Sequence, residues 1–132
     1  MTAKIYTFAV PNQIYGTNLF VSMNNLLINV TARCPIRTTL ELIGGKWKLL
    51  IVYQIAENSV RLSELKRQIP DISEKMLIQE LKKLVDSNLV ARHNFGEVPP
   101  RVTYSLTEKG LKIIPLIDQI GKFGIDYMKN IQ

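Results

Sequence analysis

Residues 63–87 read SELKRQIPDISEKMLIQELKKLVDS, and the helix caps and breakers in this stretch are the clearest structural signal in the chain. We expect Ser63 to cap a first short helix, which Pro70 ends because proline has no backbone N–H to donate. Ser73 then caps a second helix, whose first turn holds Glu74, an acidic residue that the helix dipole favours at this end. Because so few residues separate the two segments, the stretch predicts a helix, a tight turn and a second helix.

The second helix, which we expect to run to about Ser87, has two contrasting faces. Its apolar face consists of Leu77, Leu81, Leu84 and Val85. The opposite face has the spacing i, i+3, i+4 and i+7 and consists of Lys75, Ile78, Gln79 and Lys82. Long polar side chains dominate this second face, so it is either a solvated surface or a surface that contacts a polar partner. Asn88, which tolerates a left-handed backbone, is expected just past the helix.

Two further helices are predicted before this pair. Pro35 stands at a favourable first helical position, and the spaced apolar residues Ile36, Leu40 and Ile43 lead to an end at Gly44–Gly45. The next helix runs from Lys46 to about Glu57 and has one apolar stripe, formed by Trp47, Leu50, Ile51 and Ile55.

A β hairpin is predicted after the helix pair. Residues 89–95 and 101–106 resemble strands, and the second run alternates Val102, Tyr104 and Leu106 toward the interior. The prolines in the intervening residues 96–100, GEVPP, stiffen the turn. The pattern therefore predicts a hairpin with a rigid, protruding loop.

A long helix ends the predicted fold. Thr107 is expected to cap it, Pro115 to kink it, and Asn130 to lie near its end. It has more apolar residues than one face can hold, so we expect one face to pack on its own domain and the other on a second copy of the chain. The candidates for this dimer interface are Ile117, Ile120, Phe123 and Tyr127. The predicted fold class is mainly α with a small β hairpin (α+β).

The composition fits one globular domain: 132 residues, 46% hydrophobic and 21% charged. The net charge of +6 permits a polyanionic partner such as nucleic acid without requiring one. One cysteine and one histidine exclude an internal disulfide and a Cys/His metal cluster, and we predict no cofactor. The sequence has no paired-carboxylate motif, nucleophile elbow or phosphate-binding loop, so we predict no catalytic residues and no enzyme. It also has no apolar run long enough to cross a membrane and no secretion signal.

Several motifs in a fixed order are more specific. They are Cys34-Pro35, Gly45-Lys46-Trp47, RLSEL (61–65), ISEKML (72–77), VPPRV (98–102) and YSLT (104–107). Over about residues 34–128 the chain resembles the HxlR-type family of bacterial transcription regulators, which are relatives of the MarR group. The resemblance implies a winged helix-turn-helix with a long C-terminal dimerisation helix. It also implies a cytoplasmic, nucleoid-associated homodimer that binds a palindromic operator in double-stranded DNA.

Residues 1–33 lie outside this resemblance and contain no Asp or Glu. We therefore predict an N-terminal extension before a domain of residues 34–132. The extension is either an element that clasps the dimer or, for residues 1–22, an upstream read-through of the gene model. The second alternative follows from Met23, which lies close to where family members often begin.

For the second helix of the pair, the resemblance implies a recognition helix in a major groove. The residues expected near base edges are Ser73, Lys75, Ile78 and Gln79, with Lys82 nearer the phosphate backbone. Gln79 is the strongest candidate for direct readout, because its amide pairs with adenine through two hydrogen bonds. Ile78 stands where the family often has a small hydroxyl residue, and its side chain suits a thymine methyl group.

Other basic residues are candidates for phosphate contacts. Arg92 and Arg101 belong to the predicted hairpin, which then acts as a wing against phosphates or in a minor groove. Lys46 stands at a predicted helix start, where free backbone N–H groups favour a phosphate. Three basic residues flank the helix pair as further candidate phosphate anchors: Arg61, Lys66 and Arg67. For each of them the alternative is a charge that serves solubility alone.

Cys34 is a candidate thiol sensor. It precedes a helix-starting proline and lies between Arg33 and Arg37 in the sequence, an arrangement that favours the thiolate. Several family members are thiol-based sensors with a cysteine at the matching place, so the resemblance implies a response to redox or electrophilic signals. The alternative is a structural cysteine, and the sequence does not identify a small-molecule effector. The alternative function for the whole chain is a winged-helix module that docks proteins and does not bind DNA specifically.

Overall fold

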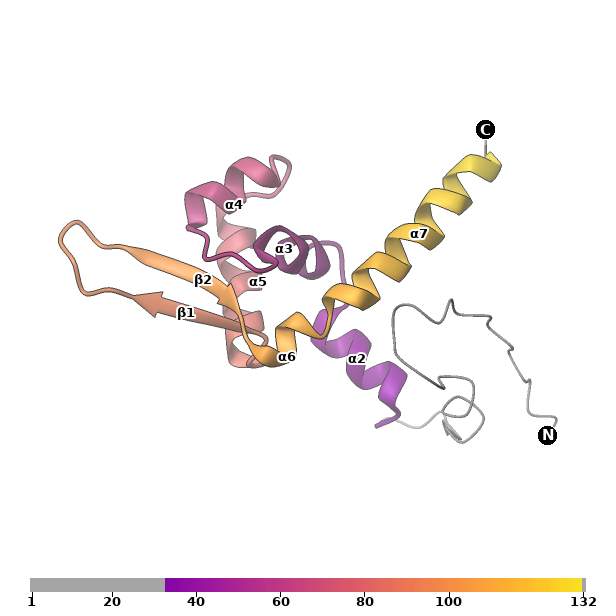
Figure 1. The fold of residues 1–132 in the computed structure, drawn as a ribbon, viewed down its shortest axis with the longest axis horizontal. Helices are drawn as coiled ribbons and strands as arrows, with labels where there is room; N and C mark the ends of the chain where they lie inside the picture. Colours follow the sequence, from indigo (N-terminus) through magenta and orange to yellow (C-terminus); the bar gives the residue numbers. More distant parts are fainter. Residues whose placement is uncertain (1–32, 132) are drawn as a thin grey trace. The chain divides into compact units, whose positions relative to one another are not determined.

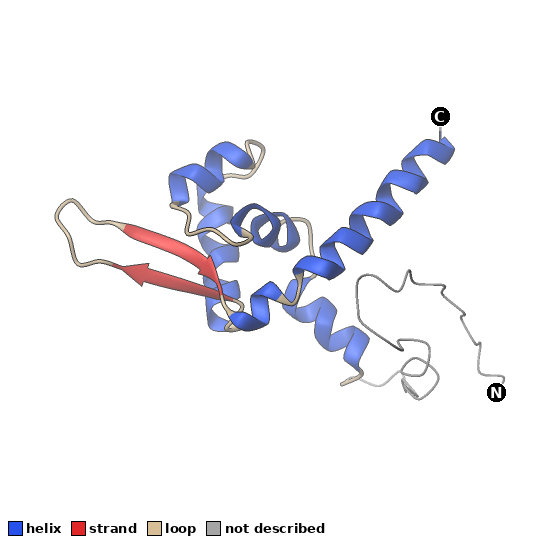
Figure 2. Cartoon of the chain, viewed as in Figure 1, coloured by secondary structure: helices blue, strands red, loops and turns tan. Residues whose placement is uncertain are grey.

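In the computed structural model of the chain, residues 33–131 are described. The chain divides into two compact units, residues 1–38 and 39–132. The described elements, in chain order, are α2 (Pro35–Ile43), α3 (Lys48–Ile55), α4 (Leu62–Gln68), α5 (Glu74–Asp86), β1 (Val90–Asn94), β2 (Val102–Leu106), α6 (Glu108–Leu111) and α7 (Ile114–Ile131) (Figure 1). Figure 2 shows that helices dominate and that the strands form one hairpin, so the predicted fold class is confirmed. The predicted N-terminal extension, apart from Arg33, lies outside the described residues.

The core of the second unit forms where α3, α4, α5 and the base of the hairpin meet. Its most completely buried side chains are Ile51, Val52, Ile55, Leu65, Ile72, Leu77, Leu81, Leu84 and Val90. The predicted apolar face of the helix after Ser73 is therefore the face that α5 buries. Truncating a buried leucine to alanine costs about 2–5 kcal/mol, so this shared core fixes the helix-turn-helix in place.

Helix α2 ends as predicted at the glycine pair. Gly45 has a φ of 96°, in the left-handed region that glycine adopts without strain. Of the three spaced apolar residues only Ile43 is buried, and the side chains of Ile36 and Leu40 are exposed.

Helix α3 begins at Lys48, so the predicted start at Lys46 is wrong by two residues. The chain still bends after the glycine pair, and Trp47 serves as the N-cap without a side-chain hydrogen bond. The buried residues of the helix are Ile51, Val52 and Ile55. Leu50, which we expected to be buried, is 44% exposed, because the buried stripe is rotated toward Val52.

Helix α4 begins at Leu62, and the predicted cap at Ser63 is wrong. Arg61 is the N-cap, and its backbone N–H donates a hydrogen bond to Oε2 of Glu64 at 3.2 Å. A carboxylate that reaches back in this way satisfies a helix-end donor without a hydroxyl residue at the cap.

Helix α5 begins and ends as predicted. The Ser73 hydroxyl oxygen accepts a hydrogen bond from the Met76 backbone N–H at 3.1 Å. Past the other end, Asn88 has a φ of 59°, the left-handed conformation that closes many helices.

The hairpin pairs β1 with β2 in antiparallel register, with Val90 opposite Leu106, Arg92 opposite Tyr104 and Asn94 opposite Val102. Tyr104 also exchanges two backbone hydrogen bonds, of 2.9 and 2.7 Å, with Val60. This bridge ties the link between α3 and α4 to the sheet. Tyr104 and Leu106 pack against the core as predicted. Residues 92–100 are exposed, and the hairpin extends beyond the helices (Figure 1).

The predicted last helix is two helices, α6 and α7. Thr107 caps α6, because its hydroxyl oxygen accepts the Gly110 N–H at 3.1 Å and its O–H donates to the Asn88 carbonyl at 2.7 Å. The chain then turns, and Pro115 is the second residue of α7, where its missing N–H is tolerated. The proline therefore follows a break and does not kink a continuous helix. Within residues 33–131, no helix is both long and apolar enough to span a membrane.

Candidate nucleic-acid interface

Helix α5 presents the predicted polar face to solvent. Lys75, Ile78, Gln79 and Lys82 are all exposed, on the side of the helix away from its buried leucines. Ser73, at the start of the same helix, is also exposed although its oxygen serves as the cap. Five of the predicted DNA-contacting residues are thus gathered on one short helix.

A charged contact that the sequence did not predict holds α5 against α3. Lys48 Nζ lies 3.8 Å from Glu80 Oε2, and the two side chains are only 13% and 12% exposed. Lys83, one turn along α5, also approaches Glu80, with its Nζ 3.5 Å from Oε1. Since Lys48 and Glu80 lie far apart in the sequence, no local spacing rule points to this pair.

The wing carries two of the predicted arginines. Arg92 is exposed on β1. Arg101 is more constrained: its guanidinium carbon lies 3.9 Å from the centroid of the Phe95 ring, and its Nη2 lies 3.4 Å from Oε1 of Glu97. His93 is occupied by a 3.2 Å hydrogen bond between its Nε2 and the Ser105 hydroxyl.

Lys46 lies two residues before α3, next to the turn of the helix-turn-helix. Its Nζ is 3.9 Å from Oδ2 of Asp71, a residue of that turn, and 4.5 Å from the centroid of the Trp47 ring. Both charged side chains of the ion pair are largely exposed. Lys46 therefore remains available for a phosphate near the helix start, with a carboxylate beside it.

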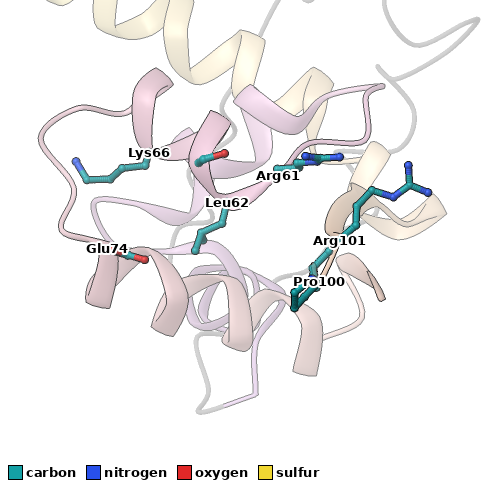
Figure 3. Close-up of a pocket in the computed structure, with 8 residues that line it drawn as sticks. Arg61, Leu62, Lys66, Glu74, Pro100 and Arg101 are labelled. Atoms are coloured by element: carbon teal, nitrogen blue, oxygen red, sulfur yellow. The ribbon is translucent and has the colours of Figure 1, made fainter. Parts of the chain in front are cut away.

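An open groove lies between the starts of α4 and α5 and the wing (Figure 3). It has a volume of about 550 Å³ and is lined by Arg61, Leu62, Ser63, Lys66, Glu74, Pro100, Arg101 and Val102. In Figure 3 the guanidinium groups of Arg61 and Arg101 point away from the middle of the groove, toward its rim, and Glu74 lies on the opposite side. The groove brings together two predicted residues that are far apart in the sequence, Arg61 and Arg101.

Lys66, which the sequence indicates as a further phosphate anchor beside Arg61, lines the same groove from α4. Its Nζ donates a hydrogen bond to the Pro70 carbonyl at 3.1 Å. Its position follows from the packing of α4 against the wing, which no local sequence pattern gives. Among the described residues, no group of three or more His, Cys, Asp and Glu side chains is arranged to hold a metal ion.

The four predicted dimer-interface residues on α7 have different environments. Ile117 packs, partly buried, against the core of its own chain. Ile120, Phe123 and Tyr127 are exposed, Phe123 by 73%, and the Phe123 and Tyr127 rings stack with centroids 6.3 Å apart. No residue of α7 is fully buried, so most of its apolar surface has no cover within residues 33–131.

Cys34 immediately precedes α2 and is buried. Its Sγ accepts a hydrogen bond from the Arg37 backbone N–H at 3.4 Å, and its carbonyl accepts one from the Thr38 N–H at 3.0 Å. The sulfur thus occupies the position of a helix cap, where free backbone N–H groups concentrate.

Comparisons with known proteins agree on one family. The sequence profile of the HxlR-like helix-turn-helix family matches residues 42–132. YkvN of Bacillus subtilis, named as an HTH-type transcriptional regulator, is 46% identical over 91 residues, which are 69% of this chain and 77% of YkvN.

Solved structures extend this similarity to the fold. A transcriptional regulator of the MarR family from Porphyromonas gingivalis W83 is 50% identical and superposes with a TM-score of 0.70, covering 74% of this chain and 95% of that one. The redox regulator HypR in its oxidized form is 38% identical with a TM-score of 0.66, covering 70% of this chain and 96% of HypR.

Proposed function

The chain belongs to the HxlR-like family of helix-turn-helix transcriptional regulators, and we propose that it binds its operator as a homodimer with one α5 helix of each subunit in the major groove. The observation that carries this proposal is the exposed face of α5, where lysine, glutamine and isoleucine side chains lie together. This function requires access to chromosomal DNA and involves no catalytic step.

Within α5, Gln79 reads a base edge and Ile78 contacts a thymine methyl group. Lys75 and Lys82 lie on the same exposed face and supply positive charge. Ser73, at the helix start, lies near a base edge, while its hydroxyl oxygen caps the helix. The two α5 helices read half-sites about one helical turn, about 10 bp, apart.

The groove and the wing supply the phosphate contacts. Arg61 and Arg101 lie on the rim of the groove, and Lys66 lines it from α4, so one DNA strand that crosses from the major to the minor groove passes between them. Lys46 contacts a phosphate beside the turn, and Arg92 does so from the outer part of the wing. These contacts position the protein, whereas those of α5 select the sequence.

Dimerisation uses the uncovered face of α7. Ile120, Phe123 and Tyr127 form an exposed apolar strip that a second copy of α7 covers across a twofold axis. Ile117, which packs on its own core, extends the strip at its edge. In this proposal residues 34–132 form the DNA-binding domain, and residues 1–33 add a clasp to the dimer.

Selection of bound sequences from random duplexes tests the function directly. A palindromic consensus with half-sites about one turn apart is expected. Gln79→Ala is expected to relax the preference at one base position, and Lys75→Ala to weaken binding to all sequences. Lys112→Ala, which removes an exposed lysine at the end of α6, controls for the loss of charge. Recovery of no consensus, or binding that is insensitive to salt, contradicts the proposal and favours a protein-docking role.

A thiol response is a second candidate function. It is favoured by the position of the Cys34 sulfur, which accepts the Arg37 N–H at a helix start, and by the similarity to the redox regulator HypR. Because each chain has one cysteine, oxidation by diamide joins the Cys34 thiols of two subunits, and the two hydrogens pass to diamide. Diamide is expected to change operator affinity in the wild type and not in Cys34→Ser. An unchanged wild-type affinity after complete thiol oxidation rejects the response.

A further inference from the structure

Two cations of the proposed DNA-binding surface already have a carboxylate partner within the chain. Arg101 on the wing pairs with Glu97, and Lys46 beside the turn pairs with Asp71. We infer that Glu97 and Asp71 lower the DNA affinity of this protein, because they compete with DNA phosphates for these two cations. The inference rests on the proposed function.

The wing shows the competition most clearly. The Arg101 guanidinium stacks on Phe95 at 3.9 Å and places Nη2 3.4 Å from the Glu97 carboxylate. Within residues 33–131, the Arg101 Nε is buried and lacks a hydrogen-bond partner. Two oxygens of a phosphate match the parallel N–H donors of the planar guanidinium and accept two hydrogen bonds at once, so a phosphate offers Arg101 more than the single carboxylate contact. To reach a phosphate, however, the side chain must first leave Glu97.

The turn presents the same arrangement on an independent element. Lys46 lies over the Trp47 ring and 3.9 Å from Asp71, and both charged groups are about two-thirds exposed. A phosphate approaching the start of α3 meets the lysine and also the carboxylate. Binding therefore breaks the ion pair and brings Asp71 close to a second negative charge.

Two separate effects follow when either carboxylate is removed. The free protein no longer has an ion pair to lose, and the complex no longer contains a carboxylate beside the phosphates. The loss of repulsion between carboxylate and phosphates raises the DNA affinity even when the cation is absent. The loss of the ion pair affects DNA affinity only when the cation is present. A double-mutant cycle between carboxylate and cation, measured by DNA binding, therefore isolates the competition.

The decisive experiment compares four proteins at the wing: wild type, Glu97→Gln, Arg101→Ala and the double variant. Fluorescence anisotropy with the selected operator and with a random duplex of equal length gives the dissociation constants. Exposed ion pairs are weak, so Glu97→Gln is expected to raise the affinity for both duplexes by roughly three- to ten-fold. In the Arg101→Ala background the same change is expected to raise affinity only about two-fold. The cycle Asp71→Asn with Lys46→Ala is expected to behave in the same way.

Glu57→Gln is the matched control. It removes one exposed carboxylate just after α3, and Glu57 takes part in none of the ion pairs found in the described part of the chain. The control is expected to change DNA affinity by less than about two-fold. If Glu97→Gln raises the DNA affinity equally with and without Arg101, the inference is overturned. The carboxylate then acts only by repelling the phosphates and does not compete for Arg101. Absence of wild-type binding to any duplex instead overturns the proposed function, and thermal melting of each variant verifies that it is folded.

Discussion

Glu80→Gln tests how far a mostly buried ion pair holds α5 in place. Glu80 is 12% exposed and faces Lys48 of α3 at 3.8 Å and Lys83 of its own helix at 3.5 Å. Glutamine keeps the shape of the side chain and removes its charge. Lys48, itself 13% exposed, then remains almost buried without a countercharge.

The magnitude follows from distance and burial. Two unit charges 3.8 Å apart attract by about 4 kcal/mol at an effective dielectric constant of about 20. Part of this attraction is offset in the wild type by desolvation of both groups. Removing one partner of a fully buried pair costs about 3–5 kcal/mol. Since both side chains of this pair keep some contact with water, we expect Glu80→Gln to lower the free energy of unfolding by about 2 kcal/mol.

Urea denaturation at one fixed protein concentration measures this change, because the stability of the proposed dimer depends on concentration. With a denaturant slope of about 2 kcal/mol per molar, the midpoint is expected to fall by about 1 M while the slope stays constant. Lys83→Ala is the control: this lysine is 61% exposed, so its loss is expected to cost less than about 0.5 kcal/mol. If Glu80→Gln costs no more than Lys83→Ala, the pair contributes no more than a surface contact and the reasoning fails.

Three further changes have clear expected results. Ser73→Ala removes the side-chain oxygen that accepts the Met76 N–H and is expected to cost about 1 kcal/mol in urea denaturation, whereas Ser73→Asn largely preserves stability. Gly110→Ala places a Cβ against the Leu89 carbonyl oxygen, so a loss of more than about 3 kcal/mol, or no soluble protein, is expected, and a normal melting temperature contradicts the close approach. Phe123→Asp puts a charge on the exposed apolar strip of α7, and sedimentation is expected to show a folded monomer with weak operator binding; an intact dimer rejects this interface.

Features of this fold that depend on neighbouring residues were predictable from sequence. The Ser73 cap, the left-handed Asn88 and the end of α2 at the glycine pair each follow from the backbone preferences of a few adjacent residues. The apolar face of α5 follows from its helical spacing, and so does the exposed face that carries Gln79.

Features that depend on distant residues were not predictable in the same way. A Pro115 inside an apolar run is compatible with a kink or with a new helix. The break before α7 is associated with contacts made by Thr107 to Asn88 and by Gly110 to Leu89, across the end of the sheet. The start of α4 at Leu62 depends on a carboxylate that reaches back to the cap.

The residues of the candidate site differ in the same way: some lie on one helix, and others are brought together by packing of distant segments. The residues of α5 were recognisable because one helix carries all of them. The groove that joins Arg61, Lys66 and Arg101 exists only because α4 and the wing pack together. The carboxylate partners of Lys46 and Arg101 are similarly visible only once the turn and the wing tip are placed.

Helix α3 links the two functions proposed for this chain, sequence reading and dimerisation. It packs against both α5 and α7, and Ile114 and Ile117 of α7 reach the same core as the buried face of α5. Because a close-packed core resists deformation, the position of α5 relative to α7 is set by side-chain packing and by the Lys48–Glu80 pair. In a dimer joined through α7, that position fixes the distance between the two recognition helices. Under the proposed function, we therefore expect substitutions at the α3 contacts to change the preferred half-site spacing, although these contacts lie outside the proposed DNA-binding face of α5.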